Sequence, residues 1–373
     1  MSSGTYISIE FKELINALVV ISSMLLVAFT LRDKFTDKNQ NIGKVTSFFI
    51  YMAFLILTMI VAFVRFDTAD LVPSQLIFIA KMLVFFLVLW LLGESRYSIL
   101  EYISQIIFVF SCLSLVLLTL RYTFGTDFLP MYQVGLVKTS FLSTYFGTDI
   151  GFSNVVRNSS IFYEPGLFSV MLSFSFYYFF TKEGFSNRCK LLYISAISTI
   201  SPVGFLLISL LLIVFYWNRS IILRVLVIVS SAFVVWFVIE FYYIKLDSVS
   251  FLYRVEDIKV GLKVFIDNVF FGVGIFNDNL ISEHFLNRYG NTRSSSNGLL
   301  TLLYQTGIIY SVIYFYFICR SVKCYFSNGY FLALVLITFI LIFQPIQYSN
   351  LLILLFIMGH FIDDKKKYSS DRA

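Results

Sequence analysis

Long apolar stretches alternate with short polar connections along most of this chain. A helix needs roughly 17 to 25 apolar residues to cross the hydrocarbon layer of a membrane. Stretches near that length, or shorter ones that pair across a tight turn, lie at residues 14–31, 45–64, 71–92, 99–120, 167–180, 221–241, 298–318, 331–343 and 351–362. The pattern predicts an all-α protein that crosses a membrane many times.

Residues 191–217 form a further apolar stretch, which the sequence SPVG at 201–204 interrupts in its middle. Proline and glycine there predict either one kinked helix or two short helices that form a hairpin. Basic residues gather in the cytoplasmic connections of membrane proteins. The basic loops around Lys190 and Arg219 can share that side only if the chain crosses twice between them, or enters the membrane and returns. We therefore favour the hairpin, and expect about eleven membrane segments, an outer N-terminus and a cytoplasmic C-terminus.

Two long polar stretches, residues 121–163 and 242–297, are then expected on the outer face of a single polytopic domain that comprises residues 1–373. The second contains residues 254–270, where apolar side chains recur at helical spacing and charged side chains occupy the other faces. The apolar positions are Val255, Ile258, Leu262, Phe265, Ile266 and Val269. This spacing predicts an amphipathic helix that lies against the membrane surface or against the protein.

The first polar stretch leads into the sequence RNSSIFYEPG, residues 157–166. A residue that precedes proline avoids the helical conformation, and proline suits the first position of a helix. Glu164 is thus expected just outside a helix that begins at Pro165, downstream of Arg157. A carboxylate in this place can take part in chemistry at the membrane surface, or it can simply complement the positive end of the helix.

Composition supports the membrane class and narrows the chemistry. Hydrophobic residues make up 58% of the chain and charged residues 13%, and the mean hydropathy is +0.84, whereas roughly a quarter of the residues of a soluble domain are charged. The net charge of +6 is spread over short loops, as orientation charges are, and does not indicate nucleic acid. The four cysteines lie outside both long polar stretches, which argues against a disulfide framework. Only two histidines are present and no nucleotide-binding loop is visible, so we expect no metal and no cofactor.

Lys81 lies near the middle of the apolar stretch 71–92. A cation at that depth costs roughly 2.5 to 3.5 kcal/mol on insertion scales, and intramembrane charges usually mark a function. The alternative is a structural pairing with a buried polar group of another helix. In either case we expect the side chain to face the interior of the helix bundle.

A small set of polar residues on the outer face carries the expected chemistry. Guanidinium groups can hold phosphate oxygens through two parallel hydrogen bonds, and a nearby carboxylate can accept a proton from an attacking hydroxyl. Arginines with one carboxylate at a membrane surface would suit a lipid-linked pyrophosphate. The candidates are Arg157 and Glu164 from the first stretch, and Arg254, His284, Arg288, Arg293 and Asn297 from the second. For each of them the alternative is a loop residue that only interacts with water.

Four segments give the chain a resemblance to a known family. They are FYEPG at residues 162–166, TISPVGFLL at 199–207, NVFFGVGIF at 268–276 and SSNGLLTLLYQTGIIYSVIYF at 295–315. In this order they resemble the bacterial O-antigen polymerases, which polymerise polysaccharide repeat units, and the related O-antigen ligases. Where related ligases carry histidine before the asparagine, this chain has Ser296 before Asn297. That departure argues against a ligase that depends on this histidine, unless His284 takes its place.

The resemblance implies a membrane enzyme that uses an undecaprenyl-pyrophosphate-linked oligosaccharide, inverts the anomeric configuration and needs neither a metal nor a nucleotide sugar. Its site would face the periplasm from the bacterial inner membrane. Arg157 with one or more of Arg254, Arg288 and Arg293 would hold the pyrophosphate. Glu164 would act as the base or orient the acceptor sugar.

We therefore expect a polysaccharide polymerase, with membrane lipid around it and a chain-length regulator protein as a further candidate partner. One alternative is a glycan ligase that uses the same donor and a different acceptor. The other is a flippase or transporter of lipid-linked glycans, with Lys81 in a central cavity. The dense arginine chemistry of the two outer stretches favours an enzyme over a transporter.

Overall fold

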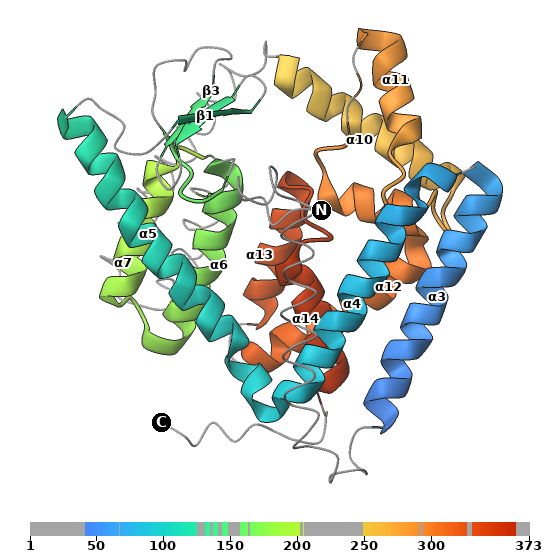
Figure 1. Cartoon of the computed structure of the whole chain (residues 1–373), viewed down its shortest axis with the longest axis horizontal. Coiled ribbons are helices and arrows are strands. Elements are labelled where there is room, and N and C mark those ends of the chain that lie inside the picture. Colours follow the sequence, from blue (N-terminus) through green and yellow to red (C-terminus); the bar gives the residue numbers. More distant parts are fainter. Residues whose placement is uncertain are drawn as a thin grey trace, which may run out of the picture.

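The computed structural model describes residues 42–66, 68–124, 131–134, 137–140, 144–147, 157–162, 165–201, 204, 249–290, 292, 294–326 and 330–362. Most of these residues are helical (Figure 1). Helices α5, α6 and α7 form one side of the molecule, and α3, α4 and α12 form the other, with α13 and α14 between them. A small sheet and the helices α10 (Val249–Asp267) and α11 (Asn279–Tyr289) lie at the same end of the bundle in Figure 1.

Four helices of the described chain are long and apolar enough to cross a membrane: α3 (Ile42–Phe66), α4 (Val72–Leu92), α5 (Ile99–Phe124) and α12 (Gly298–Tyr325). The short 3-10 turns η1 (Ala69–Leu71) and η2 (Gly93–Ser98) connect the first three. Shorter helices are α6 (Pro165–Glu183), α7 (Asn187–Ser198), α13 (Tyr330–Phe343) and α14 (Asn350–Phe361). The predicted stretches 14–31 and 221–241 lie outside the described residues, so the total of about eleven segments stays a prediction.

Helix α6 begins at Pro165, as the sequence predicts. Helix α7 ends at Ser198, so the apolar stretch 191–217 is broken close to its predicted interruption. Beyond Gly204 that stretch lies outside the described residues, and the hairpin stays a prediction.

The expected all-α class needs one addition, because the first long polar stretch contains a small antiparallel sheet. Its strands are β1 (Met131–Val134), β2 (Val137–Ser140), β3 (Thr144–Gly147) and β4 (Arg157–Asn158), and they lie in sequence order. In the register of the last pair, Tyr145 lies opposite Arg157. The sheet therefore fixes the backbone of the residue that begins the RNSS segment.

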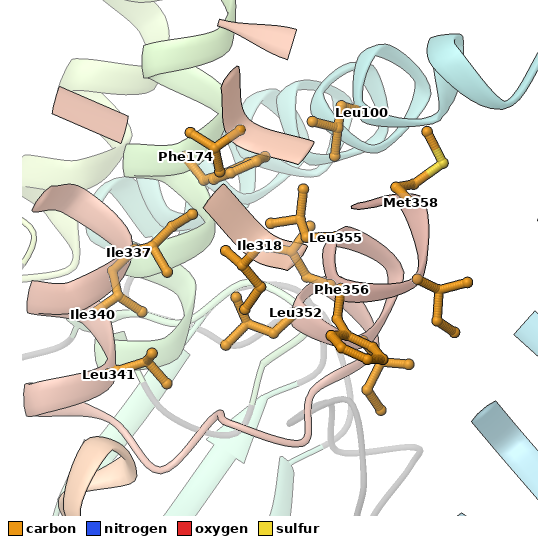
Figure 2. Packing of buried hydrophobic residues seen from close by; sticks show 14 of the residues in the cluster. Leu100, Phe174, Ile318, Ile337, Ile340, Leu341, Leu352, Leu355, Phe356 and Met358 are labelled. Atoms are coloured by element: carbon orange, nitrogen blue, oxygen red, sulfur yellow. The ribbon is translucent and has the colours of Figure 1, made fainter. Parts of the chain in front are cut away.

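Helices α3 to α7 and α12 to α14 share one hydrophobic core, in which α12 packs against α13 and α14, whereas α10 and α11 pack on Tyr304 in a second, smaller cluster. Figure 2 shows Ile318 of α12 beside Leu352 and Leu355 of α14, with Ile337 and Ile340 of α13 on the other side. All five side chains are buried. This core holds α12 in place, and α12 in turn carries the elements of the candidate site.

Helix α12 is broken at Gly307, whose φ of 73° and ψ of 174° are not helical. In an unbroken helix the N–H of Ile308 would bond to the carbonyl of Tyr304, and the carbonyl of Gln305 would also accept a bond from the next turn. The break frees these backbone groups inside the protein, where an unpaired N–H or carbonyl is costly. They need partners from another part of the chain.

The loop after α10 supplies those partners. The N–H of Val273 donates to the first freed carbonyl (2.8 Å), and the N–H of Gly274 donates to the second (2.9 Å). The carbonyl of Val269 accepts the freed N–H (2.7 Å). The segments NVFFGVGIF and LLYQTG are thus two halves of one structural unit, which explains why they occur together in the sequence.

Helix α10 (Val249–Asp267) lies where the amphipathic helix is predicted, and the structure shows which of its residues pack on the protein. Its buried face carries Asp257, Gly261 and Val264. At Gly261 an added Cβ would lie 3.6 Å from Leu300 Cδ1 of α12, so the two helices approach closely. Of the apolar stripe, Ile258, Leu262 and Ile266 are exposed, Ile266 to 66%, whereas Phe265 packs on the cluster around Val264. The exposed part of the stripe does not pack on the protein, and we expect it to contact lipid.

Leu262→Glu combined with Ile266→Glu is expected to lower the unfolding temperature by several degrees in lipid nanodiscs. Carboxylates on a lipid-facing stripe would be removed from water, whereas exposed substitutions usually change the free energy of unfolding by less than about 0.5 kcal/mol. The control Lys263→Glu places a carboxylate on an exposed position beside the stripe. Equal shifts for both proteins would show that the stripe faces water.

Candidate functional site

Helix α11 (Asn279–Tyr289) packs on α10 through aromatic side chains. The ring of Tyr253 on α10 lies 5.6 Å from that of Phe285 and 5.0 Å from that of Tyr289, measured between centroids. Gly290 ends the helix in the left-handed conformation, with a φ of 72°. This short, well-anchored helix carries His284 and Arg288 on one face, four residues apart.

Both of those side chains bond to one buried carboxylate, Glu256 of α10. Its Oε1 lies 3.0 Å from His284 Nε2 and accepts a hydrogen bond from Arg288 Nη1 at 2.5 Å. The Glu256 side chain is 9% exposed, whereas those of His284 and Arg288 are 36% and 56% exposed. A buried carboxylate is stable only with such partners. We call this group of three residues the Glu256 cluster.

The Glu256 cluster leaves donors available at the surface. Guanidinium carries five N–H donors, and imidazole has a second ring nitrogen. In the part of the chain with described side chains, Arg288 makes one hydrogen bond and His284 makes one. The cluster thus presents an imidazole and a guanidinium at the surface, and the buried carboxylate of Glu256 fixes the orientation of both. This arrangement can bind an anion, and it can hold an imidazole in one orientation for proton transfer.

The start of α12 is joined to α10 by the residue next to Glu256. Asp257 is fully buried, and its Oδ2 accepts hydrogen bonds from the N–H (3.0 Å) and Oγ (2.7 Å) of Ser296. Asn297 caps the helix, because its Oδ1 accepts the N–H of Leu300 at 3.0 Å. The position where related ligases carry histidine is therefore an anchor in this chain. Asn297, a predicted binding residue, is 8% exposed and serves to begin α12.

Arg157 lies beside the broken end of α7. Its Nε donates to the carbonyl of Thr199 and its Nη2 to the carbonyl of Ile200, both at 3.0 Å. Carbonyls at the end of a helix lack helical partners and carry partial negative charge, so a cation there is stabilising. The fork of Arg157 satisfies two successive carbonyls at once. In the structure this predicted catalytic residue caps a helix end.

The next residues continue this contact. Asn158 Nδ2 donates to Ser114 Oγ of α5 (3.1 Å) and to Ser198 Oγ of α7 (2.9 Å), and Ser160 Oγ donates to the carbonyl of Phe110 (3.3 Å). Asn158 and Ser160 are buried against the middle of α5. The RNSS segment therefore joins three elements, and the resemblance segments at 162–166 and 199–207 meet through it.

The predicted site residues fall into two separate groups. Arg157 lies with α5 and α7, while His284 and Arg288 lie on α11 at the other side of Figure 1. Arg254 is exposed on α10, close in sequence to Glu256. The predicted residues Glu164 and Arg293 lie outside the described residues.

Lys81 is half-buried on α4, and its Nζ lies 5.9 Å from the centroid of the Phe85 ring. Among the residues that the structure describes, no carboxylate lies within ion-pair distance of it. A pairing with a buried polar group of another helix thus has no support in the described part of the chain. Its expected role inside the bundle stays a prediction.

Sequence reasoning missed a buried network beside the first turns of α12. Asp278 Oδ1 accepts hydrogen bonds from Tyr304 Oη (2.5 Å) and Gln305 Nε2 (2.8 Å). Gln305 Oε1 in turn accepts the Tyr348 hydroxyl at 2.9 Å. Burial raises the pKa of the Asp278 carboxyl, and the hydrogen bonds it accepts act in the opposite direction. No local signal marks these residues, because each lies in a segment that is otherwise apolar or loop-like.

The region that contains the Glu256 cluster matches a known protein family. Residues 191–315 match the model of the O-antigen ligase family, and this match confirms the resemblance seen in the sequence. The matched region includes the Glu256 cluster and α12 up to residue 315, with the break at Gly307. No curated protein matched the chain. With the four long apolar helices, the match supports a multi-pass membrane protein that processes glycan in an O-antigen pathway.

Proposed function

We propose that this protein is a polysaccharide polymerase that joins oligosaccharide repeat units carried on undecaprenyl pyrophosphate. A hydroxyl of the acceptor sugar attacks the anomeric carbon of the donor, and a new glycosidic bond forms. The bond from that carbon to the pyrophosphate oxygen breaks, so undecaprenyl pyrophosphate leaves and the hydroxyl proton passes to a base. The reaction takes place at the outer face of the bacterial inner membrane, without a metal.

The Glu256 cluster is the observation that carries this proposal. It lies within the region matched by the family model, on helices beside the start of α12. Negative charge grows on the pyrophosphate as the glycosidic bond breaks, and donors already in place stabilise it most at that point. Arg288 fits this role because its guanidinium is half-exposed and held at one end by Glu256.

The other predicted residues take roles that follow from their places. Arg254 and Arg293 would bind further phosphate oxygens, and Asn297 acts by fixing the start of α12. Glu164 remains the candidate base, and His284 is the second candidate because Glu256 orients its ring. Arg157 acts at a distance, through the end of α7.

Surface polysaccharide from a deletion strain tests the reaction. A polymerase predicts that single repeat units replace the ladder of chain lengths. A strain that keeps its ladder on the lipid carrier but no longer transfers glycan to another acceptor would instead support the ligase. Loss of every outer-face product, with lipid-linked units retained inside, would support the flippase.

Glu256→Gln is expected to shorten the polysaccharide and to lower turnover about 10²-fold at matched protein level, because a donor displaced by about 1 Å can cost that much. Arg288→Ala should give the same phenotype. The control Glu283→Gln removes an exposed carboxylate from α11, the helix that carries Arg288, and should leave the ladder intact. A full ladder from either Glu256→Gln or Arg288→Ala would remove the Glu256 cluster from the site.

A further inference from the structure

A buried arginine lies at the end of the bundle opposite α10 and α11, in the turn η2 that connects α4 and α5 (Figure 1). Arg96 is 6% exposed. Its Cζ lies 4.6 Å from the centroid of the Phe361 ring and 5.3 Å from that of Tyr97. The Tyr325 hydroxyl donates to its backbone carbonyl at 3.1 Å, which fixes the turn against the end of α12.

In the part of the chain with described side chains, no anionic group pairs with the guanidinium of Arg96. Its Nε has no hydrogen-bond acceptor among the same residues. Two described acidic side chains at this end of the bundle have partners of their own: Glu183 pairs with Arg188 (2.9 Å), and Glu101 bonds to Gln105 (3.1 Å). Aromatic rings attract a cation, but they do not replace hydrogen bonds to an anion.

Other features at this end suit a negatively charged ligand. Lys182, in the last turn of α6, and Arg96 both act electrostatically on the thiol of Cys324 at the end of α12, so the two cations converge there. Tyr97 and Tyr325 place hydroxyl-bearing rings beside them, as is usual where a helix leaves the hydrocarbon layer. The charge pattern of the sequence predicts this end to be cytoplasmic.

We propose that Arg96 binds the phosphate of an anionic phospholipid headgroup in the leaflet at this end of the bundle. Guanidinium can hold two phosphate oxygens together, and its flat faces remain free to stack on rings. The lipid would thereby join η2 to the ends of α6, α12 and α14. This site lies away from the Glu256 cluster and does not depend on the proposed reaction.

The test compares unfolding temperatures of the purified full-length protein in detergent with phosphatidylglycerol, with phosphatidylcholine and with inorganic phosphate. Phosphatidylglycerol is expected to raise the wild-type value by a few degrees more than phosphatidylcholine, because a ligand of the folded state stabilises it. Arg96→Gln should abolish that difference. Without anionic lipid this variant should unfold no earlier than the wild type, since it removes a buried charge with no partner. The control Arg188→Gln removes an exposed cation from the same end and should respond as the wild type does.

Three results would overturn the proposal. One is an undiminished response of Arg96→Gln to phosphatidylglycerol. Another is an equal response of the wild type to inorganic phosphate, which would assign a free anion. The third concerns the tail carboxylates. If Asp363→Asn with Asp364→Asn lowers the unfolding temperature in lipid-free detergent, and the same double substitution has no effect in Arg96→Gln, the tail carboxylates are the partner of Arg96. If Arg96→Gln does not fold, Arg96→Lys keeps the charge without the fork. Native mass spectrometry should then find one phosphatidylglycerol fewer on that variant, and equal counts would overturn the proposal.

Discussion

Gly307→Ala is expected to leave little folded protein in the membrane. The φ of 73° and ψ of 174° at this position fall in a region that only glycine adopts readily, and other residues there cost about 1–3 kcal/mol. An added Cβ would also press against the carbonyl of Phe270 and lie 2.7 Å from the backbone nitrogen of Phe271. Neither atom can rotate away, so the loop would have to leave α12.

The displaced loop would take its hydrogen bonds with it. The three backbone bonds between α12 and the loop are each worth about 0.5–1.5 kcal/mol, and the groups left behind would be buried without partners. Together with the backbone cost, the total loss reaches about the 4–5 kcal/mol that marks an exceptional substitution. Gly272→Ala should act alike, since its Cβ would lie 2.5 Å from the carbonyl oxygen of Gln305.

Gly290→Ala is the matched control for Gly307→Ala. Its φ of 72° is nearly the same, but no atom lies within 4 Å of an added Cβ. Only the backbone cost remains, about 1–2 kcal/mol. Immunoblots of membranes and unfolding temperatures in detergent measure both variants. If Gly307→Ala lowered the protein level in membranes no more than Gly290→Ala, the hydrogen-bonded contact between α12 and the loop would not contribute to stability.

The helices could be predicted because the membrane imposes their length and composition. Helix α12 illustrates both the strength and the error of this reasoning: it was predicted at 298–318 and extends to Tyr325. The polar residues of its last two turns end the apolar pattern but not the helix, since Ser321 bonds to a carbonyl of α14. The sheet was not predicted because strands of four residues are too short to show a period.

The contacts of the site could not be predicted, because they join residues far apart in the chain. Glu256 was placed on a polar face of its helix, yet it is buried by partners 28 and 32 residues away. His284 and Arg288 are spaced by about one helical turn in the sequence. This spacing indicates that the two side chains share a face of their helix, but it does not indicate that they bond to one carboxylate. Arg157 bonds to backbone carbonyls, which every residue carries, so no residue type marks them in the sequence. The interruption at 201–204 was the one sequence feature that pointed to this helix end.

Arg157→Lys is expected to reduce both polymerisation and the stability of the protein. Nε and Nη2 of arginine reach two successive carbonyls, whereas an ammonium is a single compact group that can satisfy one of them well. Hydrogen bonds from charged groups are worth about 1.5–3 kcal/mol each, so the loss is about 2 kcal/mol. Arg157→Ala would lose both bonds and should be worse. Membrane protein level, unfolding temperature and polysaccharide chain length are measured together for each variant.

The combined readout separates a structural from a catalytic role for Arg157. If it caps α7, Asn158→Ala should mimic Arg157→Lys, because Asn158 joins the same helix end to α5 without carrying charge. Arg188→Lys is the control: that arginine pairs with Glu183 at the surface, where such pairs contribute at most about 1 kcal/mol. If Arg157→Lys lost the ladder while its protein level and unfolding temperature stayed unchanged, the result would support pyrophosphate binding by Arg157. An intact ladder in Arg157→Ala would remove it from both roles.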